Sequence, residues 1–104
     1  MRVIMKVSMP TPEGNAKVLE GMLDSTLSKI FADIKPEAVY FTAMDGKRTA
    51  LVVLDLAEPS DMVRVAEPFF LGLNAGVEYF PAMVPADLQK AAPHFEKAVK
   101  EYGR

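Results

Sequence analysis

Three charged residues, Lys6, Asp55 and Glu78, form the group best suited to chemistry in this sequence. A lysine that carboxylates flank away from water can act as a general acid or base. The same three residues can instead form an ion-pair network that fixes the register of an interface. Both interpretations require a fold that brings the three side chains to one surface.

Two tyrosines and one histidine are further polar candidates. Tyr40 can donate a hydrogen bond to a ligand oxygen, whereas Tyr79 is expected to face helices, with its hydroxyl satisfied locally. His94 is the only histidine, and histidine is the residue type that changes charge near neutral pH. Because His94 follows Pro93 in the first turn of a predicted surface helix, an ordinary solvated role is the alternative.

Phenylalanines supply the apolar candidates for a ligand pocket. Phe69 and Phe70 could line a cavity under a helix that Pro68 displaces, although aromatic residues at helical spacing are usually core residues. Phe80 is expected near Lys6 and Tyr40, on a face that could serve as a pocket or as a dimer face.

Composition excludes several function classes. The chain has no cysteine and one histidine, which excludes disulfides, thiol nucleophiles and multi-histidine metal sites within one chain, so no metal is expected. It has no glycine-rich phosphate loop, nucleophile elbow or dinucleotide motif, so no cofactor is expected. The net charge of −2 and the scattered basic residues argue against nucleic acid as a partner.

Length and hydropathy predict one domain over residues 1–104 in the cytoplasm. Lys6 interrupts the first apolar run too early for a signal peptide. No segment approaches the roughly 18 consecutive apolar residues of a membrane span. We therefore expect no membrane contact.

Periodicity predicts four strands. Residues alternate over 2–9, 37–44 and 48–56, and a fourth strand over 77–84 carries Pro81, which suits an edge position. Asp45 and Gly46 form a strong hairpin signal between the second and third strands.

Apolar residues at helical spacing predict the helices. One amphipathic helix of about six turns is expected up to Ile34, with Thr11 as its cap and Pro12 at its first position. A second stripe runs from Met62 to Leu73, and Pro68 should kink or split that helix. The tail from Leu88 to Tyr102 is helical in pattern, with Pro93 dividing it into a short turn and a final helix.

This order of elements predicts an α+β fold, the ferredoxin-like βαββαβ antiparallel sheet with strand order 4-1-3-2, both long helices on one face and an additional C-terminal helix. The more apolar face should lie under the helices and comprises Val3, Met5, Val7, Met9, Val39, Phe41, Ala43, Ala50, Val52, Leu54 and Leu56. The other face should carry Ile4, Lys6, Ser8, Tyr40, Thr42, Leu51, Val53, Asp55, Glu78 and Phe80. That open face is apolar enough to mark an interaction surface, and a two-fold homodimer is its simplest cover.

The element order, the half-polar sheet face and the C-terminal extension resemble the dimeric α/β-barrel superfamily of ferredoxin-like domains. The segments 66–70 and 77–84 look most like those of small bacterial proteins of unknown function. The resemblance implies two sheets packed face to face. Some members of that superfamily are cofactor-independent oxygenases, haem-degrading enzymes or isomerases, so the resemblance implies an activity of one of these kinds. This chain departs from the haem-degrading pattern, because it has no tryptophan and a single late histidine.

Two hypotheses follow for the function. The first is a homodimeric module that self-associates through its sheet face and binds a small apolar molecule. The alternative is a small cofactor-independent oxygenase or isomerase that acts on an apolar or aromatic molecule in a cavity lined by Tyr40, Phe69, Phe70 and the Lys6 cluster.

Overall fold

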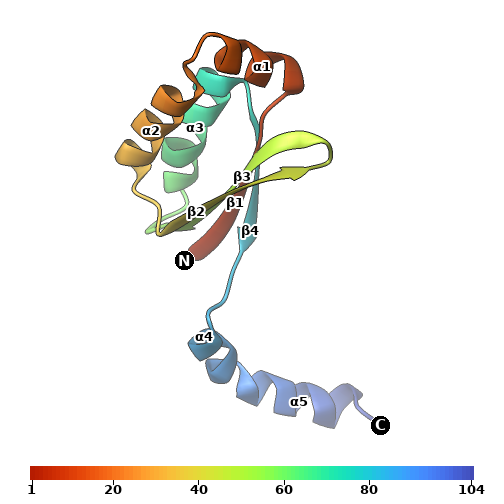
Figure 1. Ribbon diagram of the computed structural model, residues 1–104. Helices are drawn as coiled ribbons and strands as arrows, with labels where there is room; N and C mark the ends of the chain where they lie inside the picture. The colour runs from red at the N-terminus through yellow and green to blue at the C-terminus, as the bar shows by residue number, and fades with distance from the viewer.

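The computed structural model describes residues 1–104 as four strands and five helices (Figure 1). In chain order the elements are β1 (Arg2–Ser8), α1 (Thr11–Leu19), α2 (Leu23–Ile34), β2 (Ala38–Met44), β3 (Lys47–Asp55), α3 (Asp61–Leu73), β4 (Gly76–Pro81), α4 (Pro85–Lys90) and α5 (Ala92–Tyr102). None of the helices is long and apolar enough to cross a membrane.

The strands form one antiparallel sheet in the order β2-β3-β1-β4, which confirms the predicted order. β2 and β3 are joined by the two-residue turn Asp45–Gly46, with Met44 paired to Lys47. Both turn residues have positive φ, 55° and 73°, as the hairpin turn that matches the strand twist requires. β4 pairs only with β1, so Pro81 lies on an edge strand as predicted.

β4 ends at Pro81, three residues earlier than the alternation predicts. Val3 lies opposite Pro81, and the backbone N–H of Ala82 still donates to the Arg2 carbonyl at 3.1 Å. β1 begins at Arg2, so no partner strand remains for Met83 and Val84. The end of the neighbouring strand therefore sets the end of β4.

The single six-turn helix predicted between Thr11 and Ile34 is wrong, because two helices occupy this segment. The helix is interrupted between Leu19 and Leu23, where Gly21 has φ of +70°. Glycine adopts this left-handed conformation without the steric cost that other residues incur. The break lets α1 and α2 take different directions (Figure 1).

α3 runs without interruption through Pro68, so the proline does not split it. Proline removes one backbone donor from the helix and its ring crowds the preceding turn, which costs about 3 kcal/mol in an ordinary helix interior. Burial of Val65, Ala66, Phe69 and Leu73 on the inner face of α3 offsets that cost. Packing against the sheet therefore stabilises α3 as one continuous helix through Pro68.

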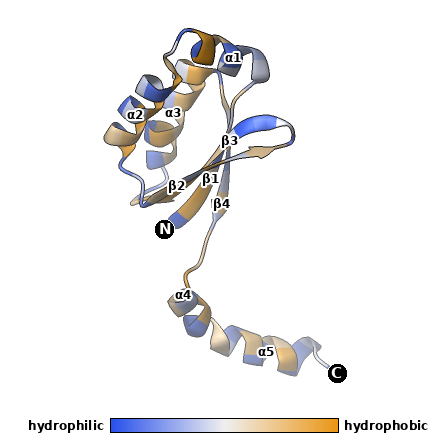
Figure 2. Cartoon of the chain, viewed as in Figure 1, coloured by the Kyte–Doolittle hydropathy of each residue, from blue (hydrophilic) through white to orange (hydrophobic).

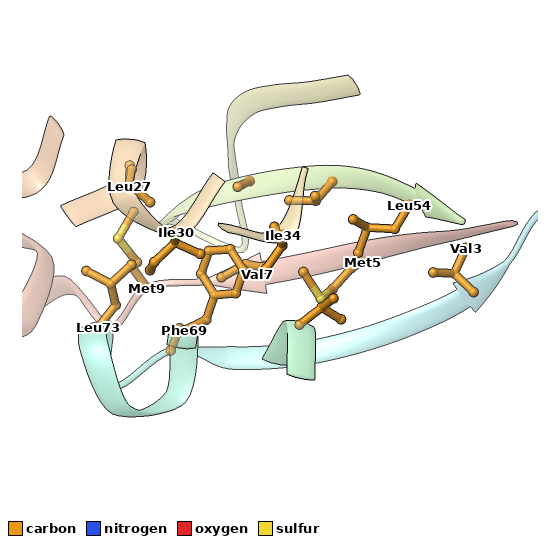
Figure 3. Packing of buried hydrophobic residues seen from close by; sticks show 14 of the residues in the cluster. Val3, Met5, Val7, Met9, Leu27, Ile30, Ile34, Leu54, Phe69 and Leu73 are labelled. Carbon is orange, nitrogen blue, oxygen red and sulfur yellow. The ribbon is translucent and has the colours of Figure 1, made fainter. Parts of the chain in front are cut away.

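The core lies between the sheet and the helix layer of α2 and α3 (Figure 3). The predicted covered face is buried along β1 and β3, whereas Phe41 and Ala43 stay exposed because β2 is an edge strand. Phe31 joins this edge to the core, with its ring centroid 6.1 Å from that of Phe41 and 5.9 Å from that of Phe69. The full set of buried core residues is Val3, Met5, Val7, Met9, Leu27, Ile30, Ile34, Ala50, Val52, Leu54, Leu56, Val65, Phe69, Leu73 and Ala75.

The C-terminal helices α4 and α5 extend from the body as an arm, which comprises residues 85–104 (Figure 1). Neither helix contains a buried residue. The radius of gyration is 17.5 Å, against about 13 Å for a compact domain of this length. The tail was predicted to divide at Pro93 into a short turn and a final helix, whereas the structure has the six-residue helix α4 in place of the turn. The residue pattern did not indicate that the two helices would lie apart from the core.

Candidate functional site

The open face of the sheet carries one uninterrupted row of apolar side chains across all four strands. The register places Ile4 between Val53 and Phe80, and Ala38 lies on the far side of Val53. Directly opposed side chains in a sheet are close enough to form a continuous surface. Ile4 is 37% exposed although it lies on the inner strand β1, and Phe80 on the edge strand β4 is 47% exposed. We call Ala38, Val53, Ile4 and Phe80 the apolar row.

A second row on the same face mixes apolar and polar side chains. Leu51 lies between Tyr40 and Lys6, and Glu78 lies on the other side of Lys6. Tyr40 is exposed and Leu51 is half-buried, so together they extend the apolar surface beside the row. The structure therefore brings the predicted residues Lys6, Tyr40, Glu78 and Phe80 together on one face.

Lys6 binds a carboxylate that the sequence pattern did not single out as its partner. Its Nζ lies 3.1 Å from Oδ2 of Asp45, in the hairpin turn between β2 and β3. The Lys6 side chain is only 14% exposed, whereas that of Asp45 is 80% exposed. The hairpin end thus curves over Lys6 and supplies its counter-ion. Asp45 has a turn role that is evident from the sequence, but its contact with Lys6 depends on this curvature.

Asp55 shares the open face with Lys6 but lies at the other end of the sheet. It pairs with Arg2, and its carboxylate lies 3.0 Å from the N-terminal amine of Met1. Lys6 lies opposite Leu51, four residues from Asp55, which is about 13 Å along a strand. Lys6 and Asp55 therefore do not lie in one cluster, and each forms an ion pair at its own end of the sheet.

Arg2 extends the polar end of this face. Its guanidinium donates to both carboxylate oxygens of Glu37, at 3.0 Å each. The hydrogen bonds that Arg2 donates to Glu37, together with the negative charge of that carboxylate, raise the pKa of Arg2. The apolar row is therefore bordered by ion pairs on one side and by the Lys6–Asp45 pair on the other, the usual arrangement of an interface with an apolar centre and a polar rim.

Tyr79 faces the helices, as its place in the alternation predicts. Its hydroxyl donates to the backbone carbonyl of Met62 at 2.6 Å, and burial raises the pKa of the phenol. Tyr79 also lines a cavity of about 480 Å³ at the start of α3. The cavity is lined mostly by apolar side chains and comprises Met1, Val3, Leu56, Ala57, Glu58, Pro59, Met62, Tyr79 and Pro81. We call it the Tyr79 cavity.

The remaining candidates lie apart from one another. Phe69 is fully buried in the core, and Phe70 is partly exposed on the outer side of α3. The sheet separates Phe69 from Lys6 and Tyr40, so these residues do not line the single cavity that the enzyme hypothesis requires. His94 is exposed in the first turn of α5, on the arm.

No His, Asp or Glu residues gather in a group of three or more that could hold a metal ion. The open face and the Tyr79 cavity both present mainly apolar side chains. No family model, curated protein or solved structure matches the chain.

Proposed function

We propose that this protein is a homodimeric binding module, in which two chains associate through the open faces of their sheets. The observation that carries the proposal is the apolar row, because its four side chains form a continuous surface that no element of the same chain covers. A contiguous exposed apolar patch with a polar rim usually marks an interaction surface. A two-fold axis buries such a patch against its own copy without any further partner.

Replacing Phe80 with lysine tests this proposal. Phe80 ends the row on an edge strand and is half exposed, so the folded chain tolerates a lysine there while the interface does not. We expect Phe80→Lys to raise the dimer dissociation constant by at least about 10-fold, since a charge replaces an aromatic ring that the dimer would bury. Sedimentation velocity over a dilution series measures that constant.

Thr42→Lys is the matched control. Thr42 lies on the same face, on the other edge strand, and is exposed outside the apolar row. It should leave the dissociation constant within about 3-fold of the wild-type value. Equal effects of the two substitutions, with circular dichroism unchanged, would contradict association through the row.

A second candidate function is binding of a small apolar molecule in the Tyr79 cavity. Its volume of about 480 Å³ lies within the roughly 300–1,000 Å³ of small-molecule sites. The Tyr79 hydroxyl is already engaged by the Met62 carbonyl, so the cavity offers apolar contact rather than a free donor. The ligand class is therefore neutral and apolar or aromatic.

Indole is a suitable probe for this cavity, followed by NMR shifts of backbone amides. We expect the largest shifts at Val3, Leu56 and Tyr79, and Met62→Trp should weaken binding by about fivefold or more because its ring fills the space. Val63→Trp is the control, because Val63 is exposed next to Met62 and does not line the cavity. Shifts confined to the open face, or equal weakening by both variants, would contradict this site.

A further inference from the structure

The arm carries an apolar stripe that nothing in the same chain covers. Phe95, Val99 and Tyr102 follow one another at helical spacing on α5, and Leu88 precedes them on α4. These four side chains are between 49% and 82% exposed. Figure 2 shows hydrophobic and hydrophilic residues alternating along α5 as an amphipathic helix requires.

The opposite side of α5 carries polar side chains that are exposed to solvent. Lys97 and Lys100 lie there, and the Lys97 ammonium is 3.9 Å from the carboxylate of Glu101. An isolated helix of 11 residues is marginal in water, where about 12–15 residues are needed even for good helix formers. The apolar stripe therefore needs a surface to pack against for the arm to be stable.

The connection between β4 and α4 directs the arm away from its own body. Only Ala82, Met83 and Val84 separate Pro81 from Pro85, and Val84 is extended with φ of −90° and ψ of 165°. The Ala82 N–H continues the ladder to Arg2, so the chain keeps the direction of β4 as it leaves the sheet. α5 then runs out on the side of the sheet opposite the helix layer (Figure 1). In the proposed dimer that side belongs to the second copy.

The exposed area agrees with a partner of the same kind. The chain exposes 7245 Å², about 1,500 Å² more than the roughly 5,770 Å² expected for a compact monomer of 11.4 kDa. A stable interface buries about 800 Å² on each partner. The excess exposed area is therefore larger than the area that one partner buries in a stable dimer. The arm and the apolar row are two places where this chain exposes apolar side chains.

We infer that the arm is exchanged between the two chains of the dimer, so that the apolar stripe of each α5 packs against the body of the second copy. This inference rests on the proposed dimer and specifies its architecture. Each chain then contributes a sheet face and an arm to the same interface. Phe95 and Tyr102 are the anchors of the arm, since aromatic side chains carry much of the binding energy of interfaces.

Isotope-filtered NMR on mixed dimers tests the exchange directly. Labelled and unlabelled full-length chains are combined in denaturant and refolded together. We expect nuclear Overhauser contacts from Phe95, Val99 and Tyr102 of one chain to the body of the other. Arm contacts found only within the labelled chain, or no arm contacts at all, would overturn the exchange and leave the proposed dimer standing. A chain that stays monomeric at NMR concentrations would overturn both.

A pair of double variants supplies a second, independent readout. Phe95→Ser with Val99→Ser removes the apolar stripe, and we expect the dimer dissociation constant to rise by about 100-fold or more. Lys97→Ser with Lys100→Ser changes the opposite side of the same helix and should change the constant by less than about 3-fold. An unchanged constant in the stripe variant would overturn the inference, while a weakened Phe80→Lys dimer would still support association through the apolar row.

Discussion

Phe69→Ala is expected to lower the free energy of unfolding by about 3–5 kcal/mol, because truncating a buried phenylalanine removes apolar contacts and leaves a cavity. Phe69 is fully buried between the sheet and α2, and its ring centroid lies 5.9 Å from that of Phe31. A loss of this size approaches the whole stability of a small domain. Urea unfolding followed by circular dichroism measures it.

The neighbouring residue is the control for this experiment. Phe70 lies on the outer side of α3 and is 41% exposed, so Phe70→Ala should cost roughly 1 kcal/mol. The pair separates a core residue from a surface residue within one helix turn. A Phe69→Ala protein as stable as wild type would show that Phe69 borders free space, and Phe69 would then again be a candidate for lining a ligand pocket.

Pro68→Ala is expected to raise the free energy of unfolding by about 1–3 kcal/mol. α3 is helical on both sides of Pro68, so alanine restores a backbone donor and removes the crowding of the proline ring. Pro68 also lines a groove between α2 and α3, and loss of these ring contacts should make the gain smaller than the full proline penalty. Thermal unfolding at fixed protein concentration measures the difference.

Glu67→Ala is the matched substitution for this prediction, since Glu67 is exposed in the same helix and alanine changes little there. It should alter the free energy of unfolding by less than about 0.5 kcal/mol. A clear loss of stability in Pro68→Ala would mean that the proline ring contributes more through packing than it costs the helix.

Residue alternation was sufficient to predict the sheet and its two faces. Strand side chains point to opposite faces with a period of two, so Met5 and Ile4 were assigned to different faces, and the structure places Met5 in the core and Ile4 on the open face. The handedness of crossovers then fixed the strand order. These rules are local or topological, and one sequence is enough to apply them.

The break between α1 and α2 was missed because the apolar stripe continues across it. Leu19, Met22 and Leu23 keep helical spacing, while the signal for a break is the single residue Gly21. Glycine occurs within helices at a modest cost, so its presence alone did not predict a break. The backbone conformation at one residue decided the outcome.

The contacts of the candidate site were harder to predict than the face on which its residues lie. Alternation places Lys6 and Asp55 on one face but says nothing about their separation along the strands, and the structure pairs Lys6 with Asp45 through the curvature of the hairpin. The position of the arm was also beyond prediction. The pattern of Phe95 and Val99 identifies an amphipathic helix but not the surface that covers it.

Sedimentation equilibrium of the full-length wild-type chain is the measurement that tests the dimer most directly. The chain has a mass of 11.4 kDa, and the apolar row together with the arm predicts a species of twice that mass, about 23 kDa, at micromolar concentration. A single species of 11.4 kDa throughout the micromolar range would contradict the proposed self-association.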